Sequence, residues 1–250
     1  MNAIFKSTLA LALSTIALQA SASLVITSND FQNGGGKDWT YAPRTSAIVS
    51  AKDDVTNKVL QFTGNSPTAV MHNFAKHDSD IFVSFDFLYT GAMSINSFLG
   101  VYFDPRVNSP SFGIKSDCGD KSGVCKNDVY VRMGESDTVM MLGSDLAANT
   151  KYTVFGRLYK EKNSATYNRF DTWLNPTAQE MQSLTGWNAS ATGKTNITEI
   201  DKLRVRTDFL DAGSRLQLDN LQVSEVPEPG TLSLLGLAMA GVAFSRRKRT

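Results

Sequence analysis

Histidine and cysteine are scarce in this 250-residue chain, which has two of each. A structural zinc site normally needs four nitrogen or sulfur ligands, often as closely spaced cysteine pairs. His72 and His77 are distant in sequence from the cysteines, and we interpret both as surface positions rather than as a base or metal ligands. The chain also lacks Gly-x-Ser-x-Gly, His-Glu-x-x-His and a phosphate-binding loop, which are motifs of common hydrolases, metalloproteases and nucleotide-binding proteins.

No sign of charge dominates, because 25 basic and 24 acidic residues give a formal net charge of +1. The ends distort this sum, since Lys6 lies in the first 22 residues and four basic residues lie in the last five. The stretch Ser23–Val226 keeps 20 basic and 23 acidic residues, a net charge of about −3. Nucleic-acid binding needs a basic surface. The acidic body therefore argues against a nucleic-acid partner.

The first 22 residues have the organisation of a secretory signal peptide. Lys6 supplies one positive charge, Thr8–Leu18 is mainly apolar, and Ala20 and Ala22 form a small-x-small end. We predict that signal peptidase cuts before Ser23. The alternative is a buried N-terminal helix, although no amphipathic stripe accompanies the apolar run.

The last 25 residues contain three signals in a fixed order. Pro227, Glu228 and Pro229 come first, and the uncharged stretch Thr231–Ser245 follows. As a helix that stretch would span ~22 Å, which is short of a ~30 Å hydrocarbon core, so it would hold the chain in the membrane only transiently. A basic cluster closes the chain and should stay cytoplasmic. It consists of Arg246, Arg247, Lys248 and Arg249.

This tail resembles the PEP-CTERM sorting signal, whose Pro-Glu-Pro matches Pro227, Glu228 and Pro229. The resemblance covers about the last 25 residues. It implies an exported Gram-negative envelope protein that an exosortase cuts, in bacteria that make exopolysaccharide. The chain would reach the outer surface or the extracellular matrix after transient anchoring in the inner membrane. A simple tail anchor is the alternative.

The two cysteines fit export. Six residues separate Cys118 from Cys125, and two of the six are glycines. In an oxidising compartment such a pair is expected to form a disulfide that closes a small surface loop. Zinc is the alternative, and a thioredoxin-like redox pair would have only two residues between the cysteines.

The body predicts an all-β protein with one short helix. In Ile81–Tyr89, large apolar residues alternate with Ser84 and Asp86, as in a strand with one buried face. Thr177 and Glu180 have capping-box spacing, and Met181 would contribute to a short apolar stripe. We predict twelve strands in two packed antiparallel sheets. These are Leu24–Thr27, Ala47–Ser50, Lys58–Thr63, Ala69–Phe74, Ile81–Tyr89, Phe98–Phe103, Val129–Met133, Thr138–Leu142, Tyr152–Tyr159, Asn168–Leu174, Lys202–Thr207 and Arg215–Val223.

Two sets of phrases resemble known sandwiches. Tyr152–Tyr159 and Arg169–Pro176 resemble late strands of concanavalin-like and laminin-G-like jelly rolls. Asn29–Phe31 with Trp39, and Leu218–Val223, resemble the first and last strands of carbohydrate-binding jelly rolls. Together they imply an antiparallel β-sandwich of the jelly-roll type. We therefore divide the chain into a signal peptide (1–22), a sandwich domain (23–225) and a sorting signal (226–250).

The jelly-roll resemblance also implies a structural calcium ion, the one cofactor that the resemblance offers. Asp30 and Asp219 match the acids near the first and last strands that often hold it, and Asp117 with Asp120 is a second candidate. Calcium prefers such hard oxygen ligands. The alternative is that Asp30 caps a turn and that Asp219 is a solvated strand residue.

Sugar binding and catalysis leave weaker signals. Pyranose rings stack on exposed aromatic faces, and Trp39 and Trp187 are our candidates, with a place in the core as the alternative. A glycosidase needs two facing carboxylates ~5–10 Å apart. Asp86 and Asp171 look instead like solvated strand residues. The sequence therefore predicts a non-catalytic matrix or envelope protein associated with exopolysaccharide, and a lectin-like module or a concanavalin-like enzyme as alternatives.

Overall fold

The structure is a computed structural model. It describes residues 24–225 except 36–38, 42–44, 53, 65–66, 95, 104–108, 118–125, 135–137, 141–143 and 162. The predicted signal peptide, the cysteines Cys118 and Cys125, and the tail from residue 226 onward lie outside the described residues. Among these residues, Val25–Ser224 form one compact unit.

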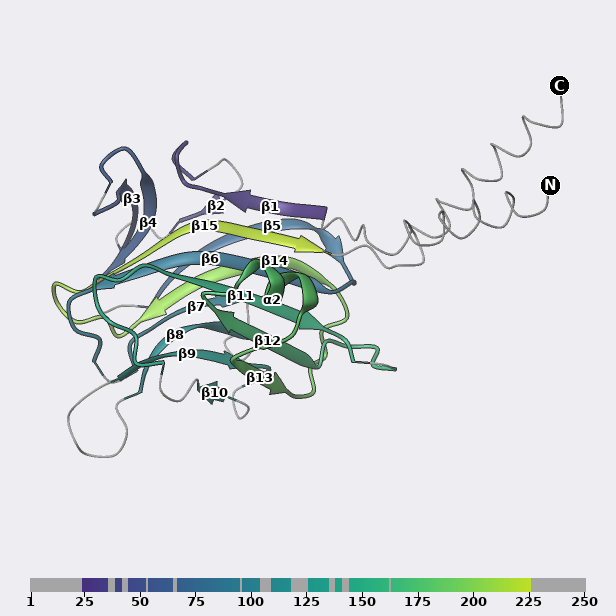
Figure 1. The fold of residues 1–250 in the computed structure, drawn as a ribbon. Helices are drawn as coiled ribbons and strands as arrows, with labels where there is room; N and C mark the ends of the chain where they lie inside the picture. Colours follow the sequence, from purple (N-terminus) through teal and green to yellow (C-terminus); the bar gives the residue numbers. More distant parts are fainter. Residues whose placement is uncertain are drawn as a thin grey trace, which may run out of the picture. The chain divides into compact units, whose positions relative to one another are not determined.

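The described residues form strands and one short helix (Figure 1). The elements are β1 (Leu24–Asn29), β2 (Trp39–Thr40), β3 (Ser46–Ser50), β4 (Lys58–Thr63), β5 (Thr68–His77), β6 (Ile81–Thr90), β7 (Phe98–Tyr102), β8 (Ser111–Asp117), β9 (Lys126–Arg132), β10 (Thr138–Met140), β11 (Tyr152–Tyr159), β12 (Arg169–Leu174), α2 (Ala178–Ser183), β13 (Ala189–Thr192), β14 (Ile200–Asp208) and β15 (Arg215–Glu225).

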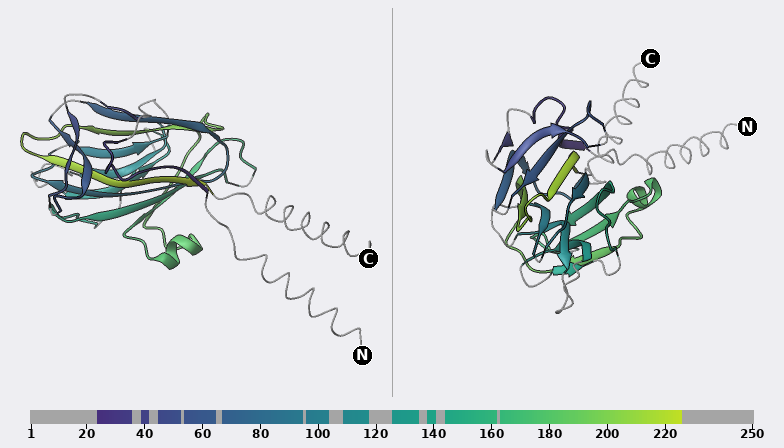
Figure 2. Two further views of the ribbon diagram at one scale, coloured as in Figure 1. Left: turned by 90° about the horizontal axis from the view of Figure 1, so that it is seen from above. Right: turned by 90° about the vertical axis from the view of Figure 1, so that its left-hand side faces the viewer.

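The strands make two sheets that face each other (Figures 1 and 2). The eight-stranded sheet has the order β13-β12-β11-β6-β15-β4-β3, and β1 also pairs with β15. The seven-stranded sheet has the order β10-β9-β8-β7-β14-β5-β2. The pairs whose registers are resolved are antiparallel, for example Val154 of β11 opposite Phe85 of β6. The fold is thus the predicted antiparallel β-sandwich of jelly-roll type.

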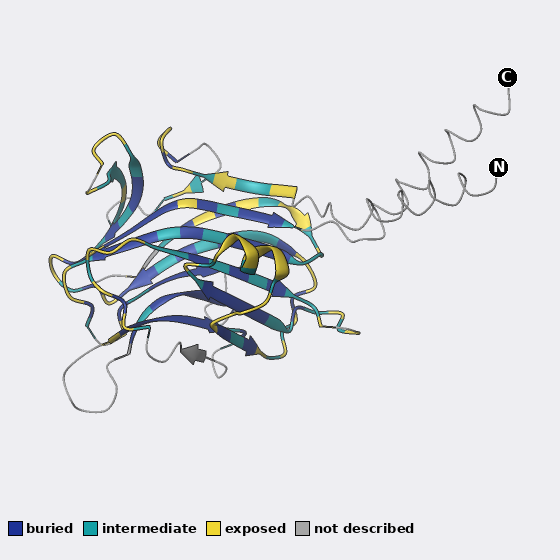
Figure 3. Ribbon diagram, in the orientation of Figure 1, coloured by how far each residue is buried: buried dark blue, intermediate teal, exposed yellow. Residues whose placement is uncertain are grey.

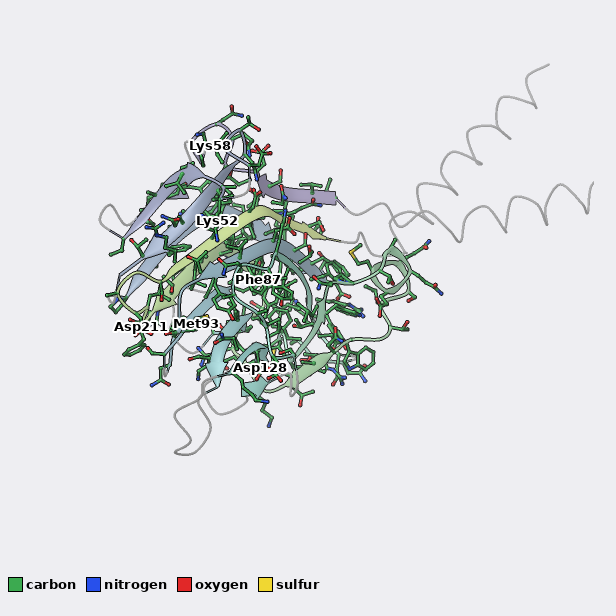
Figure 4. All side chains as sticks on the ribbon, turned by 60° about the vertical axis from the view of Figure 1, so that its left-hand side comes forward. Lys52, Lys58, Phe87, Met93, Asp128 and Asp211 are labelled. Atoms are coloured by element: carbon green, nitrogen blue, oxygen red, sulfur yellow. The ribbon has the colours of Figure 1, made fainter. Side chains whose placement is uncertain are left out.

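The core between the sheets follows from strand alternation. Phe85 and Phe87 of β6 are buried, whereas Ser84 and Asp86 on the other face are partly exposed. Figure 3 colours β6 with the buried and intermediate classes, and Figure 4 labels Phe87. Phe112 of β8 lies with its ring centroid 5.3 Å from that of Phe85, so aromatic rings join the two sheets. The alternation predicted for Ile81–Tyr89 is confirmed.

The helix begins where the sequence predicts it. Thr177 is its N-cap, its hydroxyl accepts a hydrogen bond from the Glu180 amide, and the Glu180 carboxylate accepts one from the Thr177 amide at 2.8 Å. The predicted apolar stripe is wrong, because α2 has no buried residue and Met181 is 39% exposed. The helix lies outside the two layers (Figure 2), so it has no core to cover.

Candidate functional site

A break in the alternation of β15 organises the most polar part of the sandwich. Leu218 and Leu221 both belong to the core although they are three positions apart along the strand, an odd number that would place them on opposite faces of a regular strand. Asp219 and Asn220 lie between, and Asn220 has a left-handed φ of 51°. One extra residue at this point is a β-bulge, and asparagine tolerates the left-handed conformation better than most residues.

The bulge lies where β15 changes partners. β4 pairs with Arg215–Leu218, and β1 pairs with β15 as well. Two amide side chains connect these neighbours. Asn57 donates to the Asp219 carboxylate at 2.9 Å and accepts from the Gln32 amide. Gln32 also exchanges hydrogen bonds with both backbone groups of Lys58, at 3.1 and 3.2 Å. It therefore bonds to β4 at Lys58, past Leu60, where the pairing of β4 with β15 ends.

The first pocket, called here the Trp39 pocket, lies between β1, β2, β5 and β15. Its volume is about 430 Å³, which suits a small ligand. Amide side chains supply much of its polar lining. The lining residues used below are Asn29, Asp30, Asn33, Trp39, His72, Asn220 and Gln222.

Trp39 and His72 form the aromatic wall of this pocket. They are register partners of β2 and β5, and their rings stack with centroids 4.8 Å apart and an interplanar angle of 14°. His72 also lies 3.0 Å from the Thr27 hydroxyl of the other sheet. His72 is only 7% exposed, so the prediction of a surface histidine is wrong at this position. Trp39 is half-buried, packs against the core and lines the pocket.

A second pocket of about 250 Å³, the Asp86 pocket, is lined by Asp86 and Asp219 together with Lys151. The Asp86 carboxylate accepts hydrogen bonds from Thr153 at 2.6 Å and Asn220 at 2.8 Å, and Lys151 pairs with it at 2.7 Å. Burial alone would raise the pKa of Asp86, but these partners together hold it below its usual value. Asp86 is therefore not the solvated residue that the sequence predicts.

Asp30 and Asp219 line different pockets. The Asp30 carboxylate accepts a hydrogen bond from the backbone amide of Gln32 at 3.1 Å, as a turn-capping residue does. Asp219 is 6% exposed, so its alternative assignment as a solvated strand residue is wrong. Within the described part of the chain, no group of three or more histidine, cysteine, aspartate or glutamate side chains could hold a metal ion. Calcium binding by Asp30 and Asp219 stays a prediction.

Trp187 lies on the outward side of the eight-stranded sheet, beside β12. It is 44% exposed, and the Arg169 guanidinium carbon lies 5.9 Å from its ring centroid. Asp171 beneath it accepts from Tyr159 at 2.9 Å and Ser190 at 2.6 Å. Burial and the Asp171 charge raise the pKa of Tyr159 to about 12. Asp171 is 2% exposed, so its predicted solvation is also wrong.

The structure thus brings together Trp39 and Asp30, places Asp219 in the adjoining Asp86 pocket and leaves Trp187 elsewhere. Sequence reasoning missed His72 and Asn220. The apolar period of β15 changes between Leu218 and Leu221, which is the signal that could have located the bulge.

Comparison with protein families matches the PEP-CTERM protein-sorting motif over residues 225–248. This confirms the sorting motif predicted from Pro227, Glu228 and Pro229, which themselves lie outside the described residues, as do Arg246, Arg247, Lys248 and Arg249. The motif implies export and sorting to the cell envelope, and the described body of the chain is a β-sandwich. No helix among the residues the structure describes is long and apolar enough to cross a membrane.

No curated protein matches the sequence, but solved structures share the fold. One is domain 4 of AbnA, a GH43 extracellular arabinanase from Geobacillus stearothermophilus, in complex with arabinotriose. It has a TM-score of 0.50 at 11% identity and covers 86% of this chain and 98% of that one. The Emp47p carbohydrate recognition domain has a TM-score of 0.50 at 8% identity, with coverages of 84% and 99%. At such identities the likeness shows the fold alone.

Proposed function

We propose that an exosortase cuts the tail of this protein after export. The mature chain then acts at the outer surface or in the extracellular matrix, associated with exopolysaccharide. The sorting motif at 225–248 supports the first part. The role is non-catalytic, and the association is made by binding a glycan in the Trp39 pocket, which is the lectin-like form of the hypothesis.

The observation that carries the glycan proposal is the composition of the Trp39 pocket. A half-buried tryptophan, fixed by stacking on His72, stands beside the side chains of Asn33 and Gln222. An aromatic ring covers the C–H face of a pyranose, and amides donate to and accept from its hydroxyl groups. A pocket of this kind needs no titratable group in order to bind.

A binding role also agrees with the hydrogen bonding of the carboxylates in the Asp86 pocket. Asn220 donates its side-chain amide to Asp86 at 2.8 Å and its backbone amide to Asp219 at 2.8 Å. Glycosidase carboxylates have to face a scissile bond from opposite sides, whereas these two face a residue of the fold. Release of reducing sugar from exopolysaccharide by the purified protein would overturn the non-catalytic role.

A glycan array probed with the full-length protein in mild detergent tests the pocket. We expect Trp39→Ala to weaken binding at least about tenfold, since stacked aromatic rings contribute much of such binding. Asn33→Ala, at an exposed pocket residue, should weaken it as well without disturbing the core. Trp187→Ala is the matched control and should change affinity less than about twofold. Equal losses at Trp39 and Trp187, or no bound glycan at all, would refute this site.

The sorting proposal has its own test. Mass spectrometry of the protein recovered from the producing cells should show cleavage at both ends, before Ser23 and near Pro227. The double variant Pro227→Ala with Pro229→Ala should keep its tail, because the two prolines hold the junction extended for the protease. Normal removal of the tail from this variant would exclude recognition through the prolines.

A further inference from the structure

Three arginines lie in a patterned array on the outward face of the seven-stranded sheet. Leu203 and Val205 of β14 point into the core, so Arg204 and Arg206 point outward. The strand register continues this face across the sheet. Arg204 lies opposite Tyr102 of β7, Tyr102 opposite Ser111 of β8, and Ser111 opposite Arg132 of β9. We call Arg132, Arg204 and Arg206 with their aromatic partners the arginine face.

Aromatic rings hold these arginines in place. The guanidinium carbons of Arg204 and Arg132 lie 5.4 and 5.6 Å from the centroid of the same Tyr102 ring. That of Arg206 lies 5.2 Å from the Phe98 ring. A guanidinium stacked on a ring keeps its N–H groups in a fixed planar fork. Such arginines lose less conformational entropy when they bind an anion than free surface side chains do.

Glycines make the aromatic floor of this face possible. Gly100 and Gly113 are paired neighbours, and Tyr130 pairs with Gly113 on the far side. A Cβ atom at Gly100 would overlap the Tyr130 hydroxyl and would lie 3.0 Å from the Tyr102 ring. The absence of that atom lets the Tyr130 ring lie over the sheet, where it is 3% exposed. The rings of Tyr102 and Tyr130 therefore lie beneath the guanidinium groups and do not project beyond them.

Charge on this face differs from that of the whole body. Lys115 and Lys202 occupy further outward positions on β8 and β14. Arg206 and Lys202 have carboxylate partners in Asp208 and Asp201, each at the long distance of 3.5 Å. Asp128 is buried and accepts hydrogen bonds from Ser144 and the backbone of Asp145. A body with a net charge of about −3 thus concentrates cations on one sheet face, which attracts anionic groups locally.

The spacing of the cations fits a polymer better than a single ion. Arg204 and Arg206 are two residues apart on one strand, or ~6.7 Å along the backbone. The guanidinium carbons of Arg204 and Arg132 lie no more than about 11 Å apart, because they are 5.4 and 5.6 Å from the centroid of the same Tyr102 ring. A small anion reaches one of these groups, whereas a chain with repeated acidic groups bridges them. Planar carboxylates match the guanidinium fork through paired hydrogen bonds. Nucleic acid carries a phosphate every ~3.4 Å along each strand. Many of its charges would therefore lie over the acidic residues outside the arginine face, which disfavours binding.

We infer that the arginine face binds the carboxylate groups of an acidic polysaccharide, as a second binding surface apart from the Trp39 pocket. The inference rests on the proposed function only for the source of the polymer, exopolysaccharide. Arginine supplies charge and geometry here, while the Trp39 pocket supplies stacking and neutral hydrogen bonds. The two surfaces can therefore be separated by substitution.

The test measures binding of full-length protein, in mild detergent at low salt, to polygalacturonate, to uncharged dextran and to double-stranded DNA. We expect binding to polygalacturonate that weakens as salt is added and little binding to dextran. The double variant Arg204→Gln with Arg206→Gln should bind polygalacturonate at least about tenfold more weakly, because charge-assisted hydrogen bonds are lost. If it fails to fold, Arg206→Gln alone serves, with a smaller loss in the same direction.

The matched control removes two positive charges from outside the arginine face. Arg157, stacked on Tyr159 of the other sheet, and the exposed Arg215 are changed to glutamine together, and affinity should stay within about twofold. Equal losses in both double variants would reduce the effect to net charge and overturn the inference. Stronger binding to DNA than to polygalacturonate would overturn it too. Trp39→Ala should keep polygalacturonate binding, so failure at the Trp39 pocket is distinguishable from failure here.

Discussion

Asp86 should make the stability of the sandwich depend on acid pH. Its side chain is 14% exposed and accepts hydrogen bonds from Thr153 and Asn220 while pairing with Lys151. These partners lower the folded-state pKa of Asp86. A carboxylate with a depressed folded pKa stabilises the protein fully above its unfolded value of about 3.9, and this contribution is lost as the pH falls through the folded pKa.

The structure sets the size of the effect. Lys151 is 57% exposed, so water and salt screen its charge and its share is about 0.5 kcal/mol. The bonds from Thr153 and Asn220 go to an ionised acceptor, and each such bond contributes about 1.5–3 kcal/mol. Because contributions within one network do not add fully, we expect Asp86→Asn to lower the free energy of unfolding by about 2–3 kcal/mol at pH 6.

Urea unfolding from pH 6 to pH 2.5, followed by circular dichroism, tests this reasoning. The gap in unfolding free energy between wild type and Asp86→Asn should shrink as the pH falls below about 4, since the wild-type carboxyl is then protonated. Asp78→Asn, at an exposed residue of the β5–β6 turn, is the control and should leave the free energy of unfolding at pH 6 near that of the wild type. A gap that stays constant from pH 6 to pH 2.5 would refute the assignment to the Asp86 charge.

Three further predictions concern the core, the cysteines and a tyrosine. Gly156→Ala places a methyl group 2.8 Å from a buried phenylalanine ring, and urea unfolding should show a loss of about 1–3 kcal/mol; an unchanged midpoint would contradict it. Cys118 and Cys125 are predicted from the sequence to form a disulfide; mass spectrometry should find them joined, and reduction should cost about 2.5 kcal/mol for a loop of about eight residues. Ultraviolet titration should find a tyrosine with a pKa of about 12, and Tyr159→Phe should remove it.

The strands that the sequence predicts well have strong alternation and those it misses do not. β6 has large apolar residues on one face, and its predicted bounds differ from the structure by one residue. β8 was missed because Phe112 and Ile114 stand between Ser111, Gly113 and the three polar residues that end the strand, and glycine and serine weaken the strand signal. β13 consists of alanine, serine and threonine, and its place in the sheet depends on pairing with β12, which local pattern does not encode.

Buried polar residues were the other failure, and the reason is their distant partners. Asp171 looks like a solvated strand residue beside Arg169 and Trp173, yet its carboxylate accepts from Tyr159 and Ser190, on the strands to either side. A polar group can be buried when it is hydrogen-bonded. Nothing near Asp171 in the sequence specifies the strand order. The partners whose hydrogen bonds offset the cost of burying its carboxylate could therefore not be found from the sequence.

The net charge of the body determines its long-range attraction for other charged molecules, but it does not describe the charge of any one sheet face. In a strand, residues two apart share a face, so Lys202, Arg204 and Arg206 place three positive charges on one side of β14. This segregation is visible in the sequence once Leu203 and Val205 are assigned to the core. What the sequence does not show is that the tyrosine of β7 lies opposite Arg204. Strand order turns a charged strand into an array, and for that reason an acidic body and an anion-binding face are compatible in one sandwich.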